Sequence, residues 1–218
     1  MKIAAFSDNH GILNFKVPDC DLLLIAGDMC GSSKIPLQRR YLDTEFRQFL
    51  QEIVNRGIPI IGTPGNHELI FESDNQTDKD LIKSLPCKFL IDETIEFEGL
   101  IIHGTPATPI FFNWAFNYSH EELVEKFKKI PENFDILISH GPPLGILDLN
   151  IRGEYCGSRA LRNRLFEIWE SNRKSTSCVT GHIHESYGFD SIGNSRLFNV
   201  SLTNHLYHRV NKVTTFEI

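Results

Sequence analysis

The chain has 218 residues, of which 41% are hydrophobic and 23% charged, a balance typical of a folded globular protein rather than a disordered or fibrous one. Its 22 Lys and Arg residues against 28 Asp and Glu residues give a formal charge of −6, the wrong sign for gripping long nucleic acid through its phosphates. The longest apolar runs have the length of strands and fall far below the ~20 residues that cross a bilayer. Long nucleic acid and membrane are therefore excluded from the partners that we expect.

The ends and the cysteines of the chain bear on its location. The sequence opens directly on a strand-like pattern without a secretory signal, which predicts a cytoplasmic protein. The five cysteines are odd in number and show no C-x-x-C spacing, so we expect reduced thiols and neither a disulfide framework nor a zinc ribbon. No repeat or linker divides the sequence, and we expect one domain over residues 1–218. The oligomeric state is left open.

Apolar runs and helix-period patterns predict strands that alternate with helices, followed by strands alone. Ser119 and Glu122 form a capping-box pattern for one helix, which ends before Pro131, and Gly57 ends another. This order predicts an α/β layer structure with two mixed sheets. In chain order we expect strand 3–6, strand 22–26, helix 42–54, strand 58–61, a short helix around 80–85, strand 100–102, helix 119–130, strand 136–138, a helix from about 158 to 169, strand 178–180, and antiparallel strands 188–192, 196–200 and 210–218.

Metal-capable side chains follow five of these predicted strands, each at the point where the strand ends. In open α/β sheets, ligands bind beyond the carboxyl ends of the strands, so we expect the five groups to converge. One such fragment alone is explained by chance or by a capping interaction, whereas five in order are not. The groups are Asp8 and His10, then Asp28, then Asn66 with His67 and Glu68, then His140, then His182 and His184.

Seven of these side chains offer a carboxylate, amide or imidazole donor, and none offers a thiolate. Such donors suit Mn²⁺, Fe, Zn²⁺ or Ni²⁺, whereas Ca²⁺ or Mg²⁺ alone would want more oxygen. Seven donors are too many for one tetrahedral ion and suit two ions ~4 Å apart with one bridging carboxylate, the arrangement that clamps a phosphoryl group. We therefore expect two divalent transition-metal ions as cofactors, with Mn²⁺ first among them. The seven donors are Asp8, His10, Asp28, Asn66, His140, His182 and His184.

The ordered fragments D-x-H, G-D, G-N-H-E, H-G and G-H-x-H resemble the calcineurin-like metallophosphoesterase superfamily over nearly the whole chain. The segments WAFN at 114–117, HGPPLG at 140–145 and GHIHE at 181–185 are similar to its metallophosphoesterase-domain-containing group, which includes small phosphodiesterases. The resemblance implies a metallophosphoesterase-type sandwich of two mixed β-sheets flanked by helices. It also implies two metal sites that share Asp28 as a bridge: Asp8, His10, Asp28 and His184 for one ion, and Asp28, Asn66, His140 and His182 for the other.

Further residues surround this expected centre. The resemblance makes His67 the acid that protonates the leaving oxygen, against a role limited to hydrogen bonding in its loop. Glu68 is expected to orient a histidine or the turn, rather than to take part directly in the reaction. For His103, which follows another strand, substrate contact and loop packing are both left open. Trp114 and Asn117 belong to a stretch whose rings either pack in a core or lid, or stack a nucleobase while its amides read the base edge.

The sequence thus predicts hydrolysis of a small phosphodiester, of the cyclic-nucleotide type, by a hydroxide held between two cations. The expected partner is a small phosphoester or nucleotide. A phosphomonoesterase or protein phosphatase with the same centre is the first alternative. A nucleotide-binding module with weak turnover is the second, although the complete set of donors and His67 argue against it.

Overall fold

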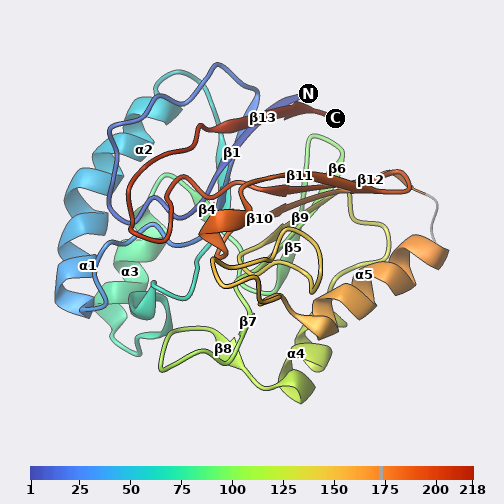
Figure 1. Ribbon diagram of the computed structural model, residues 1–218. Coiled ribbons are helices and arrows are strands. Elements are labelled where there is room, and N and C mark those ends of the chain that lie inside the picture. Colours follow the sequence, from blue (N-terminus) through green and yellow to red (C-terminus); the bar gives the residue numbers. More distant parts are fainter. Residues whose placement is uncertain (172–173) are drawn as a thin grey trace.

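Two β-sheets lie against each other at the centre of the protein, and helices cover the outer face of each sheet (Figure 1). The computed structural model describes residues 1–171 and 174–218. The two chain ends meet, because the N-terminal amine of Met1 donates a hydrogen bond of 2.7 Å to the carbonyl oxygen of Ile218. The expectation of two mixed sheets flanked by helices is confirmed.

The first sheet has the strand order β13-β1-β2-β3-β4. Strands β1 to β4 run parallel to their neighbours, and β13 pairs antiparallel with β1, with Ile3 opposite Phe216. The carboxyl ends of β1, β2 and β3 therefore lie side by side at one edge. The strands are β1 (Lys2–Phe6), β2 (Leu22–Ala26), β3 (Ile60–Thr63), β4 (Lys88–Phe89) and β13 (Thr214–Glu217).

The second sheet has the order β11-β12-β10-β9-β6-β5. Its four inner strands are parallel, and the two edge strands pair antiparallel with their neighbours. The carboxyl ends of β9 and β10 are adjacent here. The strands are β5 (Glu93–Phe97), β6 (Leu100–Thr105), β9 (Ile136–Ser139), β10 (Ser177–Thr180), β11 (Gly188–Ile192) and β12 (Ser195–Asn199), and a separate small pair joins β7 (Thr108–Pro109) to β8 (Asn117–Tyr118).

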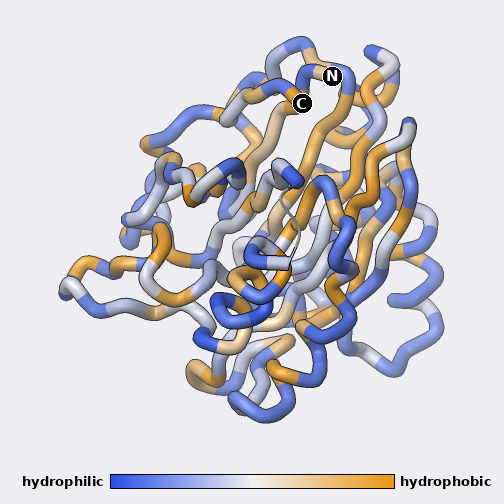
Figure 2. Tube along the Cα trace, turned by 90° about the vertical axis from the view of Figure 1, so that its right-hand side faces the viewer, coloured by the Kyte–Doolittle hydropathy of each residue, from blue (hydrophilic) through white to orange (hydrophobic). Residues whose placement is uncertain are grey.

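Strand alternation divides the apolar side chains among three core layers. In β2, Leu23 and Ile25 pack toward the first group of helices, whereas Leu22 and Leu24 pack between the sheets. In β9, Leu137 faces the second group of helices. Because both faces of these strands are buried, they read as unbroken apolar runs, which the hydropathy colouring shows as orange strands at the centre (Figure 2).

The helices differ from the sequence expectation mainly in where they begin. The helix expected at 42–54 starts earlier, as α1 (Ile35–Tyr41), continues through a π-helical turn (Leu42–Phe46) and ends as α2 (Arg47–Val54). Pro36 lies in the first turn of α1, where its missing N–H has no helical partner to lose. Helix α3 (Gln76–Ser84) also starts earlier, because Asn75 caps it through a bond from the Thr77 amide.

The two remaining helices cover the second sheet (Figure 1). Helix α4 (His120–Phe127) has the predicted capping box between Ser119 and Glu122, and α5 (Arg159–Ser171) confirms the last helix. The final strand is shorter than expected, Thr214–Glu217 instead of 210–218. Among the described residues, every helix falls short of the length and apolarity that a membrane span requires.

Candidate metal centre

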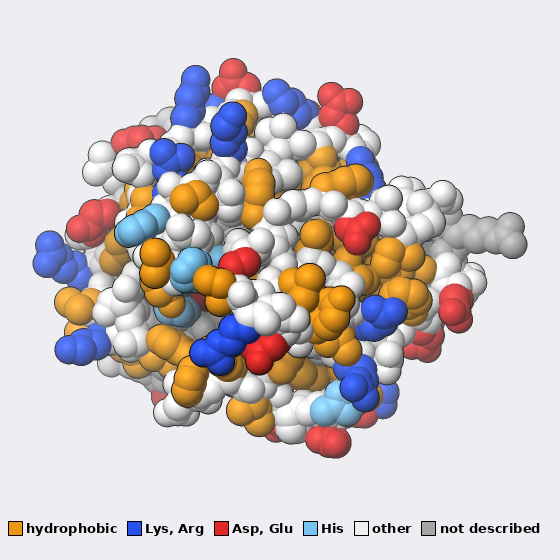
Figure 3. All heavy atoms as spheres, viewed as in Figure 1, with side chains coloured by type: hydrophobic (Ala, Val, Ile, Leu, Met, Phe, Trp, Pro, Cys, Tyr) orange, Lys and Arg blue, Asp and Glu red, His pale blue; other side chains and the backbone are white. Residues whose placement is uncertain are grey.

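Residues that follow β2, β3 and β10 line one cleft of about 510 Å³, and the carboxyl ends of the neighbouring parallel strands β1 and β9 lie beside it. This volume is in the usual range of small-molecule sites. Figure 3 shows hydrophobic side chains gathered around the histidines of this region. The structure brings all seven expected donors together here, as the distances below show.

Asp28 lies at the middle of the cluster. Its Oδ1 is 3.3 Å from Nε2 of His140, and its Oδ2 is 3.9 Å from Nε2 of both His10 and His67. The donor atoms of Asp28, His140 and His182 lie within 4.8 Å of one another, as do those of Asp28, His10 and His67. The two oxygens of one buried carboxylate therefore face two different groups of imidazoles.

A third group adjoins these two. Nε2 of His184 is 3.4 Å from Oδ1 of Asp8 and 3.1 Å from Nε2 of His10. The Nδ1 atom of His184 lies 3.0 Å from the carbonyl oxygen of Asn204, and Nδ1 of His140 lies 2.8 Å from that of Ala26. A proton on each Nδ1 leaves the Nε2 lone pair turned toward the carboxylates, which is the tautomer that a metal ligand needs.

The chemistry of this donor set fits divalent cations. Nε2 of His140 lies 2.9 Å from Oδ1 of Asn66 as well as close to Asp28, so acceptor atoms crowd around one point. Nitrogen and carboxylate lone pairs that face one another at such distances need a proton or a cation between them. Buried imidazole, carboxylate and amide oxygen without thiolate match Mn²⁺, Fe, Zn²⁺ or Ni²⁺.

The charges of the cluster shift the titration of its members in opposite directions. Burial opposes charging of His140 and His184, yet Asp28 and Asp8 outweigh it and raise the pKa of each histidine to about 9. Burial lowers the pKa of His10 to about 4 and that of His182 to about 3. Burial works against the Asp8 and Asp28 carboxylates too, but the surrounding histidines hold their pKa values below the ordinary range.

The backbone is strained at the residues that carry these donors. Asp8, His10, Asp28 and His182 have φ angles of 53°, 42°, 53° and 66°, in the left-handed region that non-glycine residues rarely adopt. Each such residue costs on the order of 1–3 kcal/mol, so the surrounding structure must hold it. Strain of this kind clusters at functional sites, and here it turns successive strand ends inward.

Two motif glycines are required by close packing around the donors. A Cβ on Gly65 would collide with Oδ1 of Asp28 and lie 2.6 Å from Cε1 of His140. A Cβ on Gly181 would collide with Ser7 and Asp8. The glycines of G-N-H-E and G-H-x-H therefore let two strand ends approach the acidic residues directly.

Glu68, expected from the sequence to support the centre, is completely buried. Its carboxylate accepts three backbone N–H bonds, at 2.6 Å from Gly65, 2.9 Å from Asp28 and 2.8 Å from Cys30. Burial and the nearby Asp28 charge raise the pKa of Glu68 to about 8. One side chain thus joins the turn after β2 to the turn after β3.

His67 lies at the cleft wall beside Asp28. Its backbone N–H donates to Oδ1 of Asp28 at 2.8 Å, and its ring stacks on Trp114 with centroids 4.2 Å apart and planes 17° apart. The buried Gln38 donates from Nε2 to the His67 carbonyl and accepts from the Ile70 amide through Oε1. The sequence reading missed Gln38, because a single glutamine in a helix carries no motif.

Two other residues were missed as well. Ser201 donates a 2.6 Å hydrogen bond to Oδ2 of Asp8, which ties the first sheet to the loop after β12. Tyr207 lines the cleft, with its ring centroid 4.7 Å from that of His10. Ser201 directly follows the predicted strand 196–200, but a lone serine carries no metal-ligand motif, and Tyr207 follows neither a motif nor a predicted strand end. Only the folded chain reveals their positions.

The three residues expected to contact substrate lie in different surroundings. Trp114 lines the cleft, but His103 does not: its residue is 1% exposed, and Nδ1 lies 2.8 Å from Oγ1 of Thr94 on the neighbouring strand. Asn117 donates from Nδ2 to the carbonyls of Phe111 and Trp114. Its Oδ1 accepts from Thr108, so both ends of this amide are hydrogen-bonded within the protein.

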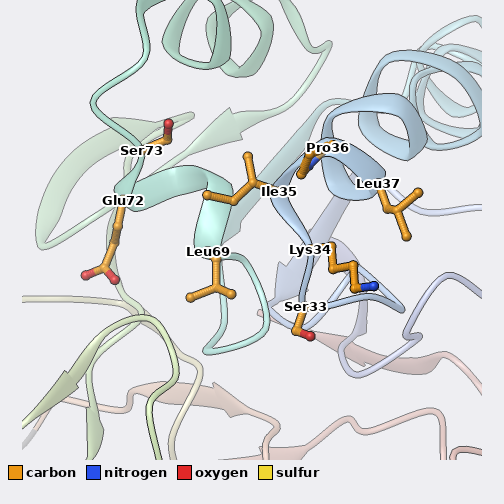
Figure 4. Close-up of a pocket in the computed structure, with 8 residues that line it drawn as sticks. All are labelled: Ser33, Lys34, Ile35, Pro36, Leu37, Leu69, Glu72 and Ser73. Carbon is orange, nitrogen blue, oxygen red and sulfur yellow. The ribbon is translucent and has the colours of Figure 1, made fainter.

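A second, more open groove of about 790 Å³ lies between the start of α1 and the 3₁₀ turn Leu69–Glu72 (Figure 4). Its lining includes Ile35, Pro36, Leu37 and Leu69, with none of the seven donors. The chemistry of the molecule therefore lies in the smaller cleft.

A two-sheet α/β sandwich with this cluster of histidines and carboxylates defines a metal-dependent phosphoesterase. The chain belongs to the calcineurin-like phosphoesterase family, whose profile matches residues 1–186. Membership in this family supports a hydrolase that acts on phosphoester bonds.

Curated relatives agree with this assignment. Metallophosphoesterase domain-containing protein 1 of Homo sapiens is 30% identical, over 96% of this chain and 68% of its own length. UPF0046 protein T07D4.2 of Caenorhabditis elegans is 31% identical, over 93% of this chain and 56% of its own. The chain thus spans little more than half of the nematode protein.

Solved structures share the fold at low identity. TT1561 of Thermus thermophilus superposes with a TM-score of 0.58 at 12% identity, over 91% of this chain and 88% of that one. Another crystal structure superposes with a TM-score of 0.65 at 16% identity, over 91% of this chain and 89% of that one. The likeness concerns the fold alone.

Replacement of Glu68 by Gln should weaken metal binding about 10–100-fold, because the amide keeps only one acceptor oxygen and its NH₂ group must face at least one of the backbone N–H groups of Gly65, Asp28 and Cys30. Calorimetric titration with Mn²⁺ measures the affinity. Glu121→Gln, at an exposed position of α4, is the matched control and should bind as the parent does. Equal affinity of the Glu68 and Glu121 variants would contradict the supporting role.

His103 should make the fold sensitive to acid. Burial lowers its pKa to about 4 from an ordinary value near 6.5, so the unfolded chain takes up its proton first as the pH falls. The stabilising contribution of neutral His103 is complete above pH 6.5 and declines toward pH 4. In urea titrations without metal at pH 7 and 4.5, the parent should lose ~2 kcal/mol more than His103→Gln. Equal losses would show that His103 does not titrate in this range.

Proposed function

We propose that the protein hydrolyses small phosphodiesters at a centre of two divalent transition-metal ions, with Mn²⁺ the first candidate. The observation that carries this proposal is the position of Asp28, whose two oxygens face two separate groups of donors. A carboxylate so placed suits a bridging ligand. Asp8, His10 and His184 would complete one site, and Asn66, His140 and His182 the other.

Two bound cations would neutralise charge on the phosphate oxygens and lower the pKa of a water molecule held with them. The proton for the leaving oxygen then comes from the chain itself. His67 is the residue for this role, because it lies in the cleft wall with Nε2 3.9 Å from Oδ2 of Asp28. Stacking on Trp114 fixes the plane of its ring.

The charge of the cleft favours a diester over a monoester. Within the described part of the chain, no Lys or Arg lines the cleft. A phosphomonoester carries close to two negative charges at pH 7, whereas a diester carries one. A phosphomonoesterase or protein phosphatase is therefore the less supported alternative. Cyclic nucleotides are among the diesters proposed, since Trp114, Phe111 and Phe112 place rings where a base could stack.

Asp28→Asn should reduce the content of both metal ions, because this carboxylate serves both sites in the proposed scheme. His10→Ala should lose one ion and His140→Ala the other. Elemental analysis of purified, Mn²⁺-loaded protein gives the ions per chain, and Asp43→Asn, at an exposed position, is the control. Two full ions in the Asp28 variant would rule out bridging.

His67→Asn should lower turnover of an alkyl phosphodiester by ~10²–10⁴-fold while the metal content stays unchanged. A nitrophenyl diester should lose much less, because its phenolate leaves without a proton. The ratio of kcat values for the two substrates measures the effect. His120→Asn, on the exposed start of α4, should leave both rates unchanged. An equal loss for both esters would assign His67 to positioning instead.

A further inference from the structure

Three loops around the cleft expose an unusual number of apolar side chains. Nine of the fourteen exposed large apolar residues in the described chain lie on these loops. Each loop also contributes lining to the cleft. We call these nine side chains the apolar rim: Ile110, Phe111 and Phe112 on the first loop, Leu149, Ile151 and Tyr155 on the second, and Leu206, Tyr207 and Val210 on the third.

The rim residues are held in place rather than left exposed by chance. Phe112 is 78% exposed at a φ of 54°, and Tyr207 is 48% exposed at a φ of 59°. A bulky side chain in this left-handed region is an outlier that the rest of the loop must maintain. Both the strained backbone and the exposed apolar area of Phe112 and Tyr207 are unfavourable, and the fold keeps these two rings in the cleft lining nonetheless.

One asparagine shapes each loop. Asn117 donates to the carbonyls of Phe111 and Trp114. Asn150 accepts from two amides of its own loop and donates to Glu154. Asn204 accepts from the amides of Leu206 and His208, at 3.0 Å each. The side-chain amides of Asn117 and Asn150 thus bond at both ends within their own loops, and that of Asn204 does so through its oxygen.

We propose that the substrate is a phosphodiester with an apolar alkyl or aryl group, which the apolar rim holds by contact while the metal centre holds the phosphate. This inference rests on the proposed function and adds the class of substrate. The rim is continuous with the cleft, and a volume of about 510 Å³ suits a small molecule rather than a protein segment. A group bound in this way is selected by size and apolar area and not by hydrogen bonds.

Binding of dialkyl phosphates is measured in the Mn²⁺-loaded His67→Asn background, in which turnover of alkyl diesters should be ~10²–10⁴-fold slower, so that the test of the rim is little disturbed by hydrolysis. Calorimetric Kd values for dimethyl, dibutyl and dihexyl phosphate, all below their aggregation concentrations, should tighten at least tenfold along the series. The double variant Ile110→Ser/Phe112→Ser should reduce that gain to threefold or less. Phe189→Ser is the matched control, since Phe189 is 59% exposed on β11 outside the cleft lining, and it should keep the full gain.

Kinetics with 4-nitrophenyl methyl, butyl and hexyl phosphodiesters separate this inference from the proposed function. We expect kcat/KM to rise with chain length in parallel with binding. Flat binding and flat kcat/KM, with the methyl ester still hydrolysed, would overturn the apolar substrate and leave the diesterase standing. A chain-length gain in binding without hydrolysis of any diester would overturn the diesterase instead.

Two results would assign the rim to another occupant and overturn the proposal. One is an unchanged chain-length gain in the double variant together with rim-dependent binding to phosphatidylcholine vesicles. The other is a parent dimer in sedimentation that dissociates when Ile110 and Phe112 are replaced. A parent whose sedimentation matches that of the double variant, with no binding to vesicles, supports the substrate role.

Discussion

Three backbone N–H groups that converge on the buried carboxylate of Glu68 determine the shape of the metal-binding edge. Gly65, Asp28 and Cys30 would otherwise leave buried donors unpaired, at a cost of about 1–3 kcal/mol each. Because these donors belong to the turns after β2 and β3, a single side chain fixes the relative position of two loops. Asp28 can then stand in its strained conformation with its two oxygens toward different imidazoles, while Oδ1 also accepts the backbone N–H of His67.

The position of Asp8 in the centre depends on contact between the two sheets. Asp8, from the first sheet, accepts hydrogen bonds from the amide of His182 and the hydroxyl of Ser201, both of which follow strands of the second sheet. The apolar layer between the sheets, which includes Phe198 and Phe216, therefore sets the distance between donors as well as the stability. A shift of one sheet against the other would separate the donor groups without changing any donor residue.

The sequence predicts the strand ends well because buried parallel strands are continuous apolar runs with polar residues directly after them. The seven expected donors lie near one another for the same reason, since each follows such a run. Strand β5 was not predicted, because its E-T-I-E-F pattern lies at a half-exposed edge of the sheet. The turn that joins it to β6 is Glu98-Gly99 and lacks the Asn-Gly signal of a hairpin. The contacts of Gln38 and Ser201 with the centre were not predicted, because they join residues far apart in the sequence and leave no local pattern.

The position of charge in the molecule explains why an apolar rim and a metal centre belong together. The chain carries a net charge of −6, and no Lys or Arg among the described residues lines the cleft. Positive charge for a phosphate inside the cleft must then come from the centre alone, because Arg152 and Arg209 belong to the rim loops and not to the cleft lining. The substrate group that lies against the lining outside the centre meets mainly the rings of Phe111, Phe112 and Tyr207, which an uncharged, apolar group can contact.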